Sequence, residues 1–247
     1  MLDSQGTVAF LPYAGSHADP FGPIQASLLA KGGMESVTLF YPGHGPRAAE
    51  PAKDSIAELV DDALEQLLKL PPPVHLLGFS MGGVVAFEST LIMAAMGQCP
   101  ASVSFMATAP PPVVRGSGLD HSNDNELIDH CARWGLIDPS LFETSVVRVA
   151  YLPPLRADVR ALDAYAARGF SGRLMPAEVS VAVFLGERDQ AAAMALDDWH
   201  TATPVQPSIF VYPGGHFFIT DCLEEVTQDY LGFLSDVTAK QKLQLVP

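Results

Sequence analysis

The sequence is short of basic residues: 14 Lys and Arg stand against 28 Asp and Glu, which gives a formal net charge of −14. Proteins that bind nucleic acids neutralise backbone phosphates with clustered Lys and Arg. We therefore expect no nucleic-acid partner. Much of the acidity is expected to serve a soluble surface, and any acidic protein partner has to be met by a local basic patch.

Cysteines and long apolar runs are also scarce. The three cysteines, at 99, 131 and 222, are far apart and odd in number, so we expect reduced thiols in a cytoplasmic protein and no metal site. No apolar run reaches membrane-spanning length, because Glu88 interrupts the stretch 84–96. The first ten residues lack the basic start and apolar segment of a secretory signal. We expect no membrane contact.

The chain does have ample material for a core. It has 247 residues, of which 48% are hydrophobic and only 17% charged. This length suits one sizeable domain, with or without an insertion, better than two. We therefore expect a single domain over residues 1–247.

Six short apolar runs alternate with helical patterns. The runs are almost continuously apolar, as strands buried on both faces of a parallel sheet should be. In one helical pattern, Ser55 and Glu58 form a capping box ahead of a one-sided apolar stripe. This alternation predicts an α/β fold, with a mostly parallel central sheet flanked by helices. The predicted strands are 7–11, 36–41, 74–79, 102–107, 179–185 and 208–212.

Residues 110–172 interrupt the alternation. They contain no convincing strand and instead show three helical patterns, around 125–134, 140–151 and 156–167. An ordinary pair of crossover helices is one interpretation, but a crossover needs only about a dozen residues. We therefore expect a helical lid insertion over the carboxyl edge of the sheet, where such folds bind ligands. Residues 127–134 are expected to control access.

A serine lies between glycines at the end of the third predicted strand, in Gly78-Phe79-Ser80-Met81-Gly82. A nucleophile on a strand–turn–helix junction has strained backbone angles, and glycine on each side avoids collisions with the strand and the helix. The helix N-terminus then favours negative charge beside the hydroxyl. Chance alone gives about 0.1 such motifs in a chain of this length. We interpret Ser80 as a nucleophile.

A serine nucleophile needs a base, and the base needs an orienting group. In folds of this kind they follow in the order Ser, Asp, His, each after a later strand. Asp189 follows the fifth predicted strand and His216 follows the sixth. Alone, Asp189 would be interpreted as a helix cap and His216 as an ordinary histidine. Their joint occurrence in this order predicts the triad Ser80, Asp189 and His216.

Two backbone amides are expected to form an oxyanion hole. One is the N–H of Met81, and the other comes from the loop after an early strand. In that loop Gly15 lets the chain turn and Ala14 is the expected donor, although an ordinary glycine turn fits the local sequence almost as well. The other histidines show no metal-ligand spacing and are treated as background: His17, His44, His75, His121, His130 and His200.

Six segments together resemble the type II thioesterases, the free-standing editing enzymes that accompany polyketide synthases and nonribosomal peptide synthetases. The resemblance extends from about residue 7 to 235, and its LRAD segment is far more family-specific than the serine turn. The segments are LPYAGS at 11–16, YPGHGPR at 41–47, GFSMGG at 78–83, LPPLRADVRALDAY at 152–165, GERDQ at 186–190 and GGHFF at 214–218.

The resemblance implies an α/β-hydrolase fold with a mobile helical lid. It also implies hydrolysis of acyl groups held as thioesters on the phosphopantetheine arm of acyl or peptidyl carrier proteins. No metal or bound cofactor is implied, and we expect a monomer. The family's functional positions match the residues already singled out: triad Ser80, Asp189 and His216, oxyanion donors Ala14 and Met81.

Three positions depart from the family pattern. Phe79, Ser16 and His44 stand where the family usually has His, Gly and Arg. None is expected to touch the triad. Ser16 leaves open which amide of the early loop is the donor, and together the changes argue against assuming the usual substrate preference.

Other functions fit the same residues. A carboxylesterase or lipase-like hydrolase would use the triad on oxygen esters. An acyltransferase or cyclase would replace water by an amine or an alcohol. An inactive scaffold would bind carrier proteins without turnover, but it requires a damaged site, and all three triad residues are present.

Overall fold

The structure is a computed structural model that describes residues 6–135, 138–169 and 172–244. Six strands form one sheet in the order β2-β1-β3-β4-β5-β6, and every neighbouring pair is parallel. The predicted α/β fold with a parallel central sheet is confirmed. The strands are β1 Thr7–Leu11, β2 Glu35–Thr38, β3 Val74–Phe79, β4 Ser102–Met106, β5 Ser180–Gly186 and β6 Ser208–Tyr212.

Strand β2 is shorter than the apolar run 36–41 predicts. The backbone makes one more bond to β1, from the Leu39 N–H to the Phe10 carbonyl, and then turns away at Pro42 and Gly43. Leu39 and Tyr41 are nevertheless buried, because the turn packs them against the core. Their apolar character therefore reflects core packing and not a longer strand.

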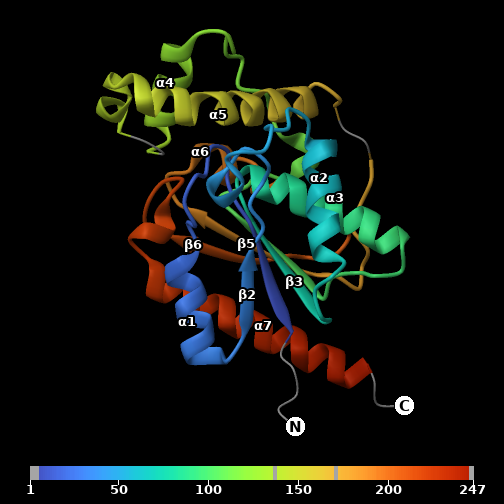
Figure 1. Cartoon of the computed structure of the whole chain (residues 1–247). Helices are drawn as coiled ribbons and strands as arrows, with labels where there is room; N and C mark the ends of the chain where they lie inside the picture. Colours follow the sequence, from blue (N-terminus) through green and yellow to red (C-terminus); the bar gives the residue numbers. More distant parts are fainter. Residues whose placement is uncertain (1–5, 136–137, 170–171, 245–247) are drawn as a thin grey trace.

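Helices cover both faces of the sheet (Figure 1). Helices α1, Gly22–Gly32, and α7, Leu223–Gln244, contact each other on one face. Helices α2, Ile56–Leu67, and α3, Met81–Ala95, contact each other on the opposite face. Each face has its own buried apolar cluster, so the two helical layers and the sheet form one α/β unit.

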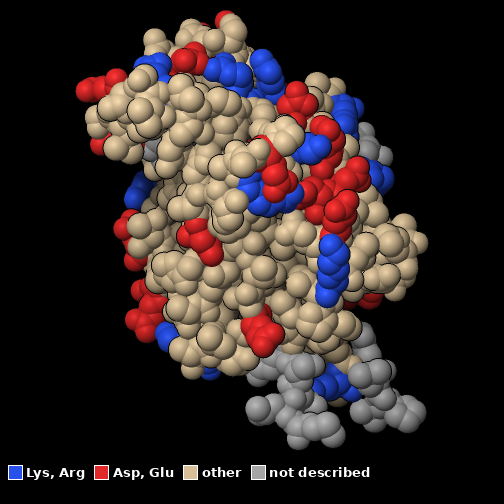
Figure 2. Space-filling model, in the orientation of Figure 1, with Lys and Arg blue, Asp and Glu red and all other residues tan. Residues whose placement is uncertain are grey.

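Helix α2 has one face in the core and an acidic face at the surface. Ser55 caps it, because its Oγ accepts a hydrogen bond from the Glu58 N–H at 3.3 Å. The inner face is buried, whereas Asp61 and Glu65 on the outer face are exposed. Figure 2 shows acidic side chains gathered over this part of the surface. Here the acidity serves a solvated face.

The apolar stretch 84–96 belongs to helix α3, which is buried between the sheet and α2. Its apolar character on all sides is that of a core helix. Within the described ranges, no helix combines the length and the apolarity that crossing a bilayer requires.

The connection between β4 and β5 is helical. It contains α4, Asp124–Arg133, and α5, Ser145–Ala166, with the 3₁₀ helix η3, Pro139–Glu143, between them. Figure 1 shows α4 and α5 above the sheet, at the end toward which the β2 arrow points. Residues 136–137 and 170–171 of the predicted lid lie outside the described residues. A separate apolar cluster ties these helices together: Leu127, Ile128, Cys131, Phe142, Leu152, Leu155 and Val159.

The prediction of two helices over 140–151 and 156–167 was wrong. Residues 145–166 form one helix of 22 residues that runs through Pro153 and Pro154. Two adjacent prolines remove two backbone donors and usually kink or end a helix. Here Leu152, Pro154 and Leu155 are buried against the rest of the molecule, and this packing holds the helix together across the proline pair.

The remaining elements are short and lie mostly at strand ends. Helix α6, Gln190–Ala193, follows β5 directly. Four further 3₁₀ helices are η1 Gly45–Arg47, η2 Pro111–Val113, η4 Leu196–Thr201 and η5 Phe218–Thr220.

Candidate active site

Ser80 lies at the turn between β3 and α3 with φ 52° and ψ −114°. A positive φ is unfavourable for a residue with a side chain, so the surroundings must hold it in place. The Ser80 N–H donates to the Met106 carbonyl at 2.8 Å, and the Thr108 hydroxyl donates to the Ser80 carbonyl at 3.2 Å. The end of β4 therefore holds the strained turn.

The glycines around Ser80 are required by close backbone contacts. A Cβ atom on Gly78 would lie 2.3 Å from the Gly82 carbonyl oxygen. A Cβ on Gly82 would lie 1.9 Å from the carbonyl oxygen of Leu11, at the end of β1. These separations leave no room for a side chain, so the motif reflects tight packing of α3 against β1 and β3.

His216 and Asp189 are brought together as the sequence predicts. The Nδ1 of His216 lies 2.8 Å from Asp189 Oδ2, and the Asp189 side chain is fully buried. A carboxylate can only accept, so Nδ1 carries the proton and Nε2 is left to exchange one. Asp189 also caps α6, because its Oδ1 accepts from the Ala192 N–H at 3.4 Å. Asp189 therefore caps the helix and contacts His216 at the same time.

Aromatic rings surround the His216 imidazole. Phe79, Phe217 and Trp134 lie with their ring centroids 5.6, 5.3 and 4.9 Å from it. The expectation that Phe79 does not touch the triad was therefore wrong. Phe79 is the last residue of β3, immediately before Ser80, and its ring packs against the His216 ring. Trp134, at the end of α4, packs against the same ring, so the helical connection also contacts His216.

A cavity of about 500 Å³ joins these groups. Ser80, Met81, His216 and Ala14 all line it. Among the described residues no direct hydrogen bond joins Ser80 to His216, as is common before a substrate binds. Helices α4 and α5 supply much of the apolar wall, and the apolar lining includes Val84, Val113, Val114, Cys131, Trp134, Leu155, Val159, Leu162 and Met194.

The two expected donor amides, those of Met81 and Ala14, have no acceptor within the described residues. Met81 is the first residue of α3, so its N–H has no acceptor within the helix. In the loop after β1, the Gly15 N–H donates to Asp158 Oδ2 at 2.7 Å and the Ser16 N–H to the Tyr13 carbonyl at 3.3 Å. Both are engaged, and Ala14, which lines the cavity, keeps its N–H free of any acceptor within the described chain.

Two of the background histidines take part in a buried cluster that the sequence interpretation missed. His44 Nε2 lies 2.9 Å from Asp158 Oδ2, and the ring of His17 lies 5.5 Å from that of His44. Helix α5 brings Asp158 to both residues. The signal was present, because His44 lies in YPGHGPR and Asp158 in LRAD. No group that could hold a metal ion occurs in the described part of the chain.

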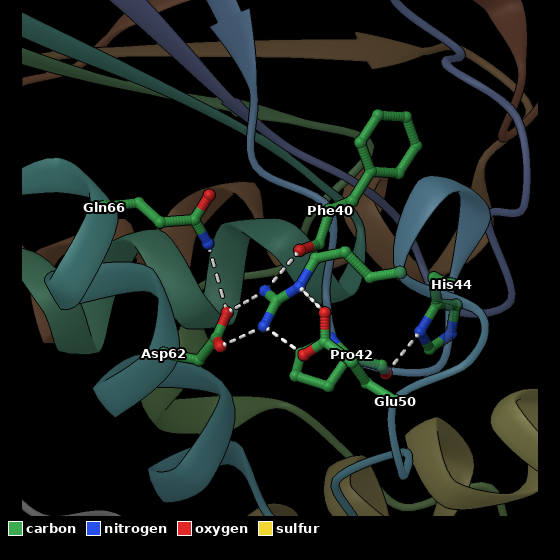
Figure 3. A network of polar contacts seen from close by, with 7 residues as sticks. Phe40, Pro42, His44, Glu50, Asp62 and Gln66 are labelled. Atoms are coloured by element: carbon green, nitrogen blue, oxygen red, sulfur yellow. Dashed lines mark hydrogen bonds and ion pairs between the residues drawn. The ribbon is translucent and has the colours of Figure 1, made fainter.

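Arg47 secures the loop that carries His44 by hydrogen bonds to Phe40, Glu50 and Asp62, which Figure 3 labels. Its guanidinium donates to both oxygens of Asp62 on α2, at 2.6 and 2.7 Å, and to both oxygens of Glu50, at 2.8 and 2.6 Å. It also donates to the Phe40 carbonyl at 2.9 Å. These carboxylates raise the pKa of Arg47, and the bidentate pairs hold residues 40–50 against α2.

Comparisons with known proteins show which family the chain resembles. Residues 7–234 match the model of a family described as the thioesterase domain. The chain is 30% identical over 227 residues to thioesterase TesA of Mycobacterium marinum, covering 90% of this chain and 88% of that one.

Two solved structures share the fold. The RedJ thioesterase of the prodiginine pathway of Streptomyces coelicolor has a TM-score of 0.79 at 23% identity, covering 94% of this chain and 86% of that one. The type II thioesterase BorB of the borrelidin cluster has a TM-score of 0.75 at 25% identity, covering 93% and 91%.

The glycine contacts predict a large stability difference between two similar substitutions. Gly82→Ala puts a methyl group into the Leu11 carbonyl and should lower the free energy of unfolding by about 3 kcal/mol. Gly232→Ala, on the exposed side of α7 with open space around it, is the matched control and should raise it by about 1 kcal/mol. Urea unfolding followed by circular dichroism measures both. Equal midpoints for the two variants would contradict the tight contact.

Proposed function

Because the chain belongs to the thioesterase domain family and is a thioester hydrolase, we propose that Ser80, Asp189 and His216 are its catalytic triad. The observation that carries this proposal is the buried 2.8 Å contact between Asp189 and His216, beside a cavity that both Ser80 and His216 line. Three residues from the ends of three different strands meet there, each in the role that its chemistry suits.

We propose the following reaction for this triad. Ser80 Oγ attacks the thioester carbonyl carbon while His216 Nε2 takes the hydroxyl proton, and Asp189 stabilises the resulting imidazolium. The oxyanion accepts hydrogen bonds from Met81 and Ala14, a contribution of about 3 kcal/mol per donor. The C–S bond then breaks, and the thiolate takes the proton from His216. Water, deprotonated by His216, releases the acyl group as a carboxylic acid and restores the serine.

We propose that the thioester is presented on the phosphopantetheine arm of an acyl or peptidyl carrier protein. The type II thioesterase BorB, to which this chain is similar, comes from a biosynthetic cluster. The largely apolar cavity suits an acyl chain. Arg115 is both exposed and part of the lining, so it lies where the cavity opens to solvent and can attract the phosphate of the arm.

We also propose that residues 110–172 act as a lid within a single domain of residues 1–247. Support comes from Trp134 and Leu155, which lie on α4 and α5 and line the cavity. We further propose that the enzyme works in the cytoplasm, which the three free cysteines, Cys99, Cys131 and Cys222, support. We also propose that it is a monomer that needs no cofactor. Size-exclusion chromatography with light scattering tests the monomer.

Comparison of two matched substrates tests the function. One is an acyl group on a holo carrier protein, and the other is the same acyl group as a simple oxygen ester. We expect a kcat/KM at least about 100-fold higher for the carrier thioester. Equal values would favour a general carboxylesterase. Products bearing an added amine or alcohol in place of the free acid would favour an acyltransferase or cyclase.

Removal of either end of the triad should abolish turnover without unfolding the protein. Ser80→Ala is expected to lower kcat about 10⁶-fold, and Asp189→Asn about 10⁴-fold because the imidazole adopts the wrong tautomer. Stopped assays on the carrier thioester measure both, with circular dichroism as the folding control. A fluorophosphonate probe should label the wild type and not Ser80→Ala. Near-normal turnover in either variant would refute the assigned role.

Trp134 is expected to limit the size of the acyl group. Its ring lies against His216 and lines the cavity, so Trp134→Ala should enlarge the space beside the reacting carbonyl. The kcat/KM ratio of a branched to a short linear acyl thioester should rise about 10-fold. Trp199→Phe, a change to a buried aromatic outside the cavity, is the control and should leave the ratio unchanged. An unaltered ratio in Trp134→Ala would argue against lid control.

A further inference from the structure

We propose that Asp158 on α5 is a positioning residue for the oxyanion hole, and that a protonated His44 holds it in place. Through this pair the helical connection sets the conformation of the oxyanion loop, defined as residues 12–16. The inference rests on the proposed function, because it assigns a role in forming the Ala14 donor. It makes the reaction depend on the charge of a histidine outside the triad.

The contacts of Asp158 carry the first half of the proposal. Its side chain is fully buried, and Oδ2 accepts hydrogen bonds from the Gly15 N–H at 2.7 Å and from His44 Nε2 at 2.9 Å. Its other oxygen, Oδ1, has no hydrogen-bond partner among the residues that the structure describes. A buried carboxylate is costly, and it is tolerated here because two donors from separate loops converge on one oxygen.

The Gly15 contact acts directly on the oxyanion loop. Gly15 has φ +76°, and a Cβ atom there would lie 2.9 Å from the Cδ1 of Leu155 on α5. The loop therefore touches α5 through both a side chain and a hydrogen bond. Because the Gly15 N–H points to Asp158, the peptide plane between Ala14 and Gly15 is fixed, and with it the backbone that carries the Ala14 N–H.

Geometry also determines the charge of His44. Its Nδ1 lies 3.0 Å from the Pro42 carbonyl oxygen, and its Nε2 lies 2.9 Å from the Asp158 carboxylate. Both neighbours are acceptors, so both ring nitrogens must carry protons for both bonds to form. The side chain is only 2% exposed, so water cannot replace either partner. His44 is therefore an imidazolium paired with Asp158.

The groups that face this pair agree with that charge state. Burial by itself lowers the pKa of His44, but the hydrogen bond and charge of Asp158, with the carbonyls of Pro42 and Tyr41, outweigh it and leave the pKa above its usual value. The pKa of His17 is lowered instead, by burial and by the neighbouring charge of His44.

One further group faces Asp158. Burial raises the pKa of Tyr41, which stays a neutral phenol, and its hydroxyl donates to the Pro12 carbonyl at 3.3 Å. It therefore adds no charge to the pair and offers the oxyanion loop a second hydrogen bond. The loop that carries His44 is itself held by Arg47 (Figure 3), so the imidazolium has a fixed place.

The direction of the pH effect follows from the raised pKa of His44. The pair is fully formed below the ordinary histidine pKa of 6.5 and is lost as the pH rises through the raised value. We expect kcat to fall at alkaline pH as His44 loses its proton.

Substitution of Asp158 tests the positioning role with a short acyl thioester that needs no carrier. Asp158→Asn keeps the shape but removes the charge, and should lower kcat about 10-fold with KM within about threefold, because a donor acting only on the oxyanion is affected. Asp124→Asn is the matched control: it breaks the Arg156 pair between α4 and α5 and should keep kcat within twofold. Asp158→Asn with wild-type kcat would overturn the inference.

Substitution of His44 tests the charge. His44→Gln keeps a side-chain donor but cannot titrate, so the fall of kcat at high pH should disappear. His200→Gln, an exposed histidine outside the cluster, should retain it. Persistence of the alkaline fall in His44→Gln, at the wild-type midpoint, would overturn the inference.

A measurement on the unmodified protein covers the case in which a variant does not fold. The ¹⁵N shifts of the His44 ring at pH 6.5 should show both nitrogens protonated, and the midpoint of their titration should match the fall of kcat. A neutral His44 at that pH would overturn the inference. A folded wild type that hydrolyses no thioester would overturn the proposed function and this inference together, whereas an active wild type with unaffected variants overturns the inference alone.

Discussion

The positive φ of Ser80 is the constraint on which the rest of the site depends. It exposes the hydroxyl only because α3 packs so closely on the sheet that Gly82 meets the Leu11 carbonyl. Leu11 ends β1 and leads into the oxyanion loop. The same contact therefore presents the Ser80 hydroxyl, our proposed nucleophile, and places the start of the loop that contains Ala14. Backbone packing, more than any side chain, therefore sets the separation between the Ser80 hydroxyl and the Ala14 N–H.

The helical connection between β4 and β5 is built into this machinery. Trp134 lies against the His216 ring, and Asp158 reaches the loop after β1. A segment whose role was only to cover the cavity would not need to contact the His216 ring or the loop after β1. Because both contacts end on groups that we propose to be catalytic, movement of α4 or α5 would change the proposed base and oxyanion donor as well as the opening.

Much of the fold could be predicted because its signals are local. Five of the six strands end within about one residue of their apolar runs. Four of these, β1, β3, β4 and β5, are buried on both faces, which is what continuous apolarity marks, whereas the edge strand β6 is apolar but mostly exposed. The prediction failed where packing overrides local preference. Pro153 and Pro154 predict a break, yet α5 continues because its buried face is held by the cluster around Leu155. In the same way Leu39 and Tyr41 look like strand residues but pack from a turn.

The sequence by itself determined the chemistry that is available: a serine that only a glycine-flanked turn can present, and an aspartate and a histidine in the order that parallel strands bring to one edge. Tertiary structure alone decided that the Gly15 and Ser16 amides of the early loop are engaged and which rings surround His216. It also brought His44 and Asp158, which are 114 positions apart in the sequence, within hydrogen-bonding distance of each other. The physical reason is the sequence separation over which each interaction acts. Turn geometry depends on residues that are neighbours in the chain. The pairing of buried charges depends on surfaces that exist only once the chain has folded.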